Sequence, residues 1–170
     1  MKYTWIVLVG LLFMAQGFTQ DQKCDRELFD AVFEGLHQKT KDTLVIRVGY
    51  APSRDVLDNL KATGLVTLKE HRMIELAIDK EYEPCQGLVD LLTNIKENSP
   101  SATKANGSYV KRHFSRPIYM SETKACIFST TSVASKKYEG GKAIGGEYIS
   151  IYTKGNGKWH FDSRQSLAMY

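Results

Sequence analysis

The chain has 170 residues, with 23 basic and 19 acidic side chains and a formal net charge of +4 at pH 7. This mild charge does not favour a nucleic-acid-binding protein, because no basic block stands out, and isolated pairs such as Lys111-Arg112 are expected to be solvated. The length is sufficient for one domain with a substantial hydrophobic core.

The first 17 residues have the pattern of a secretory signal peptide. Lys2 supplies the positive end, residues 6–14 form the apolar run, and Ala15-Gln16-Gly17 offers a small-x-small cleavage site. An uncleaved N-terminal anchor is the alternative, but the run is too short for a typical transmembrane helix. We therefore expect a signal peptide over residues 1–17, one domain over residues 18–170, and no membrane span after cleavage. The expected location is periplasmic or extracellular.

Helical patterns dominate the first part of this domain. Apolar residues from Leu28 to Leu36 recur at helical spacing, and Asp25 before them can cap the helix. A second helix is expected between Ser53, as N-cap, and Gly64, as the terminating residue. Between these helices, residues 43–50 are rich in β-branched side chains and predict a strand.

Two more helices are expected before the sheet. Thr67-Leu-Lys-Glu70 matches a capping box and predicts a third helix to about Lys80. Pro84 interrupts the chain, and the apolar spacing of residues 88–95 predicts a fourth helix. Residues 99–108 read as a polar loop.

The last third of the chain predicts a run of strands. Residues 117–120 and 123–135 form the first two, and the second is apolar on both sides, as expected for a central strand. Residues 147–154 and 158–164 flank Asn156-Gly157, the strongest short hairpin signal, because a type I′ turn needs positive φ at both central positions. A glycine-rich connection spans residues 136–146. Helices first and strands last predict an α+β fold, with N-terminal helices packed on a C-terminal antiparallel sheet, a β-meander.

Period-two alternation assigns side chains of the last hairpin to two faces. Trp159 and Phe161, with Ser163, are expected on the apolar core face. The opposite face would carry the candidate ligand-binding residues, which are His160, Asp162, Arg164, Tyr148 and Tyr152. A histidine beside a carboxylate can act as a general acid or base, and an arginine can grip an anion. If the sheet is curved this face would form a pocket; the more common alternative is a solvated outer face.

The three cysteines suit an exported protein with one disulfide. We expect Cys24 to pair with Cys85, and Cys126 to be a buried small hydrophobe in the central strand. Cys85 before a helix could also be a nucleophile, but its surroundings match no protease signature.

No metal site is expected, because His71 and Glu75, four residues apart, would supply only two ligands and are expected on a solvated helix face. No cofactor and no catalytic residue are assigned.

Motifs of the last third resemble the tail of small exported proteins of Gram-negative bacteria. These are residues 114–119 (Phe-Ser-Arg-Pro-Ile-Tyr), 124–128 (Lys-Ala-Cys-Ile-Phe), 145–148 (Gly-Gly-Glu-Tyr) and 157–159 (Gly-Lys-Trp). The resemblance covers about a third of the chain and implies a β-meander and an envelope location, without catalytic residues. The closing Gly-Lys-Trp hairpin is also similar to NTF2-like α+β cone domains, which would imply a pocket between helices and a curved sheet.

Three functional hypotheses follow. The first is a non-enzymatic exported domain that binds a partner protein or a small ligand. The second is a pocket enzyme or ligand-binding protein that uses the face of His160. The third is an inhibitor or immunity-type protein, which would have no small-molecule pocket.

Overall fold

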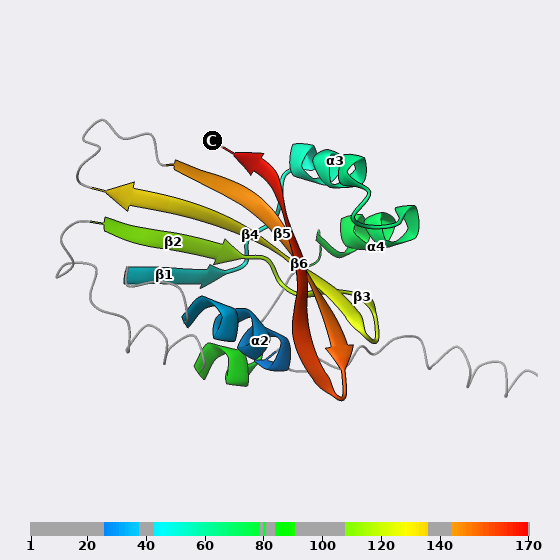
Figure 1. Cartoon of the computed structure of the whole chain (residues 1–170), viewed down its shortest axis with the longest axis horizontal. Helices are drawn as coiled ribbons and strands as arrows, with labels where there is room; N and C mark the ends of the chain where they lie inside the picture. Colours follow the sequence, from blue (N-terminus) through cyan, green and yellow to red (C-terminus); the bar gives the residue numbers. More distant parts are fainter. Residues whose placement is uncertain are drawn as a thin grey trace, which may run out of the picture.

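The computed structural model describes residues 26–37, 43–78, 80, 84–90, 108–135 and 144–169. The predicted signal peptide, most of the glycine-rich connection and the predicted helix beyond Asp90 lie outside these ranges. The described residues form an α+β fold in which helices precede a mostly antiparallel sheet, as the sequence predicted (Figure 1). The elements in chain order are α2 (Arg26–His37), β1 (Thr43–Val48), α3 (Arg54–Thr63), α4 (Leu68–Ile78), β2 (Ser108–Phe114), β3 (Ile118–Ser121), β4 (Lys124–Ser135), β5 (Ile144–Gly155) and β6 (Lys158–Met169).

The sheet has six strands in the order β1-β2-β4-β5-β6, with β3 paired to β4 off this path. β4 is central, as predicted, and β1 pairs with β2 in parallel. The strand β2 was not expected from the sequence, because it follows a polar loop and its centre is the consecutive run Lys111-Arg112-His113. It joins the segment at residues 43–48 to the meander and so extends the sheet toward the N-terminal half.

β2 and β3 lie end to end along one side of β4, and Ser115 joins them. Its backbone N–H donates to Phe128 O at 2.8 Å, and its buried Oγ accepts from Phe128 N at 2.9 Å. Ser115 thereby satisfies the backbone of β4 where the ladder is interrupted before Pro117, which has no N–H to donate.

Helices cover both faces of the sheet (Figure 1). We call these the α3–α4 face and the α2 face. On the α3–α4 face, helix side chains pack on residues of the strands, namely Ile118, Met120, Cys126, Phe128, Ile149, Ile151 and Leu167. On the α2 face, α2 and Leu88 of the helical segment 86–90 pack on Phe114, Ala125, Ile127, Tyr152 and Trp159. Burial of both faces at this end of the sheet explains why β4 is apolar on both sides.

The local signals for helix and turn ends are confirmed. Ser53 Oγ accepts from Val56 N, and Gly64 ends α3 with φ of 67°. Thr67 and Glu70 form the reciprocal capping box, with Thr67 N to Glu70 Oε2 at 2.8 Å and Glu70 N to Thr67 Oγ1 at 3.2 Å. Asn156 and Gly157 turn between β5 and β6 with φ of 51° and 78°, both positive as a type I′ turn requires.

Cys126 is free and fully buried, as expected for a residue of the central strand. Cys85 is disulfide-bonded and packs against the α2-face core. Its predicted partner, Cys24, lies outside the described residues, so the Cys24–Cys85 pairing stays a prediction. No helix among the described residues is long and apolar enough to cross a lipid bilayer.

Candidate functional site: an arginine pocket on the α2 face

A β-bulge in β6 changes which side chains share a face. Ile151 pairs with Ser163 and Tyr152 pairs with Phe161, so Asp162 is one extra residue on β6. Each extra residue reverses the alternation that follows it. The expected division of this strand was therefore wrong: Trp159, Phe161 and Arg164 share the α2 face.

The bulge separates Arg164 from His160. The register of the hairpin, which pairs His160 with Thr153 and Trp159 with Lys154, separates His160 from Tyr148 and Tyr152. His160 pairs with Thr153 on the α3–α4 side of the hairpin and is exposed, and the bulge residue Asp162 is exposed as well. Tyr152 is on the α2 face but is buried in the core, where burial raises the pKa of its phenol to about 12. Only Arg164 and Tyr148 of the expected set come together at a cavity.

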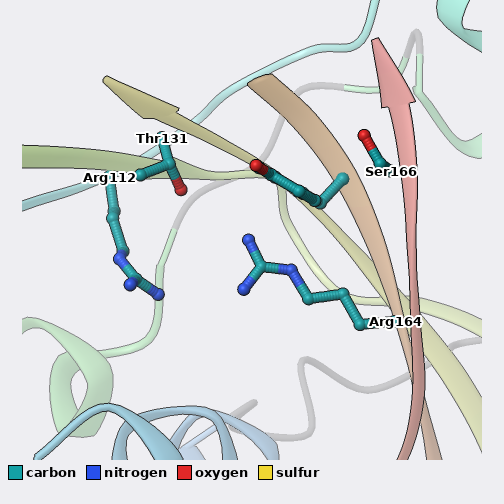
Figure 2. A pocket seen from close by; sticks show the side chains of 5 residues that line it. Arg112, Thr131, Arg164 and Ser166 are labelled. Carbon is teal, nitrogen blue, oxygen red and sulfur yellow. The ribbon is translucent and has the colours of Figure 1, made fainter. Parts of the chain in front are cut away.

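That cavity lies on the α2 face and has a volume of about 340 Å³. It is lined by Arg112 of β2, Thr131 of β4, Tyr148 of β5, and Arg164 and Ser166 of β6. Figure 2 shows Arg112 and Arg164 pointing toward one another across it from strands on opposite sides of β4 and β5. We call this site the arginine pocket.

The pairing of the strands explains why these five side chains meet. Thr131 stands opposite Arg112 on one side and opposite Gly146 on the other, and Tyr148 stands opposite Ser166. Gly146 contributes no side chain, and Met169 Sδ and the hydroxyl of Tyr148 occupy the place where its Cβ would stand. A Cβ at Gly146 would lie 2.7 Å from Met169 Sδ, 2.9 Å from Ala168 O and 3.0 Å from Tyr148 Oη.

Arg164 is held by an aromatic ring. Its guanidinium carbon lies 3.9 Å from the ring centre of Tyr148, and the Tyr148 hydroxyl donates to Met169 Sδ at 3.6 Å. A guanidinium stacked on an aromatic face keeps its N–H groups at its edge, where they remain able to donate.

Two polar atoms of the pocket are buried without a partner. Nε of Arg112 and Oγ1 of Thr131 have no hydrogen-bond partner among the described residues. Leaving a buried donor unpaired costs about 1–3 kcal/mol, so such atoms are rare in folded proteins and require an explanation.

The electrostatics of the pocket are unbalanced. Burial lowers the pKa of Arg112, and the nearby charge of Arg164 lowers it further. Burial also lowers the pKa of Arg164, while Tyr148 and Tyr152 act in the opposite direction. The described lining residues include no carboxylate that could neutralise the two guanidinium groups. The pocket thus holds two positive charges, one on the half-buried Arg112 and one on the exposed Arg164, together with several hydroxyl groups.

Sequence reasoning missed Arg112, Thr131 and Ser166. Arg112 was expected to be solvated, yet it lies in phase with the buried residues Val110 and Phe114 on β2. A charged residue at a core-facing strand position can indicate a binding site. This indication could be recognised only once β2 was known to be a strand.

The predicted solvated position of His71 is also wrong. His71 is buried, and its Nε2 lies 2.9 Å from Leu57 O, an acceptor, so Nε2 carries the proton. Its Nδ1 lies 3.7 Å from Glu75 Oε2. This histidine is satisfied within the core between α3 and α4. The described residues contain no group of three or more histidine, cysteine or acidic side chains suited to hold a metal ion.

No protein-family model matches the chain, and neither a curated protein nor a solved structure matches it at a significant level. Function is therefore inferred from the arginine pocket itself.

Proposed function

We propose that the protein is an exported, non-catalytic binding protein that takes a small organic anion into the arginine pocket. The observation that carries this proposal is the pair of unpartnered buried atoms, Nε of Arg112 and Oγ1 of Thr131, in a cavity with two guanidinium groups. An anion between the two guanidinium groups would neutralise their charge, and it would accept hydrogen bonds from Nε of Arg112 and Oγ1 of Thr131 once these atoms, which solvent does not reach, turn toward it.

The lining supports binding more than catalysis. A general acid or base close to the reacting group is the usual minimum for proton-transfer chemistry, and histidine or a carboxylate most often fills that role. The described lining residues are two arginines, one tyrosine, one threonine and one serine. His160, on which the pocket-enzyme hypothesis depends, is exposed on the other side of the hairpin. The export predicted from residues 1–17 would place this binding in the periplasm or outside the cell.

The size of the pocket supports a small ligand. Ligand cavities in proteins typically measure about 300–1,000 Å³, and this cavity of about 340 Å³ stands at the lower end of that range. An inhibitor or immunity-type protein predicts no such pocket, so the cavity favours a small-molecule ligand over that alternative.

Calorimetric titration of the purified protein with a panel of small carboxylates and phosphates tests the proposal. We expect saturable binding of at least one anion and none of the matching neutral compounds. Arg112→Gln and Arg164→Gln should each weaken binding by about tenfold or more, because each removes charged donors. The matched control is Arg47→Gln, because Arg47 is exposed on β1 away from the pocket. Equal losses in all three variants, or no anion bound by the wild type, would contradict the proposal.

A further inference from the structure

The charge of the arginine pocket restricts the class of anion. Building on the proposed function, we infer that the ligand is a phosphate monoester of a small polyhydroxylated compound, whose phosphoryl group lies between Arg112 and Arg164.

The first step is charge balance. Arg112 and Arg164 stand close enough for each charge to oppose the other, and the described lining contains no acidic side chain. A monocarboxylate would leave one of the two positive charges uncompensated. A phosphate monoester carries a charge of about −1.5 to −2 near pH 7, so one group can balance both guanidinium groups.

The second step is direction. Arg112 approaches from β2 and Arg164 from β6, and their guanidinium groups border the same open space from two sides (Figure 2). A single tetrahedral group has oxygens directed to both sides and can accept from both arginines at once. A dicarboxylate would instead need two arginines set apart by the length of the ligand. Two guanidinium groups that border one space therefore favour one doubly charged group.

The third step concerns the remainder of the ligand. Every described lining residue carries a hydrogen-bonding group, and three of them, Thr131, Tyr148 and Ser166, carry hydroxyls. One face of the Tyr148 ring is occupied by Arg164, so this ring offers little room for stacking a nucleobase on that side. A compact body with several hydroxyl groups, such as a sugar, fits both the chemistry and the small volume of the cavity.

Calorimetry with four matched probes and inorganic phosphate tests this inference. The probes are glucose 6-phosphate, glucose 6-sulfate, gluconate and glucarate, which vary charge and shape on a similar carbon skeleton. We expect glucose 6-phosphate to bind at least about tenfold more tightly than each of the other three probes. The reason is that only its phosphoryl group carries two charges on one tetrahedral centre. Binding should be lost in both Arg112→Gln and Arg164→Gln and retained in Arg47→Gln, with circular dichroism verifying that each variant is folded.

The outcomes separate this inference from the proposed function. If gluconate or glucarate binds as tightly as glucose 6-phosphate, the pocket binds anions but the phosphate inference is wrong. If inorganic phosphate binds as tightly as glucose 6-phosphate, the polyhydroxylated body contributes nothing and that half of the inference is wrong. If no anion binds the wild-type protein, the inference and the proposed function both fail.

Discussion

The guanidinium group of Arg164 stacks on the ring of Tyr148, with 3.9 Å between the guanidinium carbon and the ring centre. The contact exists because the bulge at Asp162 turns Arg164 to the α2 face, where Tyr148 of β5 already points. A cation–π contact of this kind contributes about 0.5–1 kcal/mol when exposed and more when desolvated. Its main effect here is to fix the direction of a positive charge that nothing else in the described lining neutralises.

The first prediction concerns Tyr148. We expect Tyr148→Leu to weaken binding of an anionic probe by about tenfold, because Arg164 loses the ring that orients it. Tyr148→Phe keeps the ring and is the matched control, so it should weaken binding much less. Isothermal titration of both variants measures the difference. An equal loss in both would mean that the hydroxyl, and not the stacking, is what the ligand needs.

The second prediction concerns the stability of the empty pocket. Arg112→Gln should increase the free energy of unfolding by up to ~1 kcal/mol without ligand, since it removes a partly desolvated charge that faces Arg164. Urea unfolding of both proteins measures this. Addition of a bound anion should stabilise the wild type and not the variant. A clear loss of stability in the empty variant would show that Arg112 has a structural partner.

The third prediction concerns Gly146 of β5, which stands opposite Thr131. Gly146→Ala would place a Cβ 2.7 Å from Met169 Sδ and 2.9 Å from the carbonyl oxygen of Ala168. We expect a loss of about 1–3 kcal/mol in unfolding free energy and weaker anion binding, because Tyr148 must move as well. Gly155→Ala is the control, since its nearest neighbour would be 3.9 Å away. Equal stability of the two variants would contradict the close packing at Gly146.

The fourth prediction concerns acid stability at the start of α4. Burial raises the pKa of Glu70, but hydrogen bonds from Lys124 Nζ at 2.8 Å and from Thr67 hold it below its ordinary value of 4.5. A carboxyl with a lowered pKa in the folded state contributes stability above pH 4.5, and that contribution is lost as the pH falls through its folded pKa.

Lys124→Gln should therefore lower the unfolding free energy near pH 7 by up to ~1 kcal/mol. The unfolding free energy of this variant should also fall less steeply than that of the wild type as the pH is lowered toward about 3. Chemical denaturation at several pH values measures both effects. The control is Lys158→Gln, which changes an exposed lysine beside the hairpin turn. Parallel pH profiles for the wild type and Lys124→Gln would exclude this role for the ion pair.

The fifth prediction concerns the cysteines. Burial raises the pKa of the Cys126 thiol well above its ordinary value, so this thiol should react with an alkylating reagent only after unfolding. Peptide mapping of the non-reduced mature protein should find Cys24 linked to Cys85. A bridge that includes Cys126, or rapid labelling of the folded protein, would overturn this assignment.

The sequence alone determined the features that depend on neighbouring residues. The turn at Asn156-Gly157, the caps at Ser53, Gly64 and Thr67, and the α+β order of elements were all predicted correctly. Each depends on backbone conformation or on hydrogen bonds within a few positions, so the residue types are enough to predict them. The grouping of side chains along β5 was also predicted correctly, because its alternation is unbroken. The prediction that Tyr152 lies on the face opposite to Trp159 was wrong, because both residues pack in the core of the α2 face.

Only the tertiary structure decided the composition of the candidate site. One extra residue at Asp162 reversed the face of Arg164 and moved it away from His160, and no local pattern in the sequence marks that position. Arg112 joined the site because β2 pairs with β4 on one side and with β1 on the other, contacts between segments far apart in the chain. Most strands can be predicted from neighbouring residues. The pocket depends on the register and the pairing of segments that are far apart in the chain, and these are determined by the energy of the whole sheet.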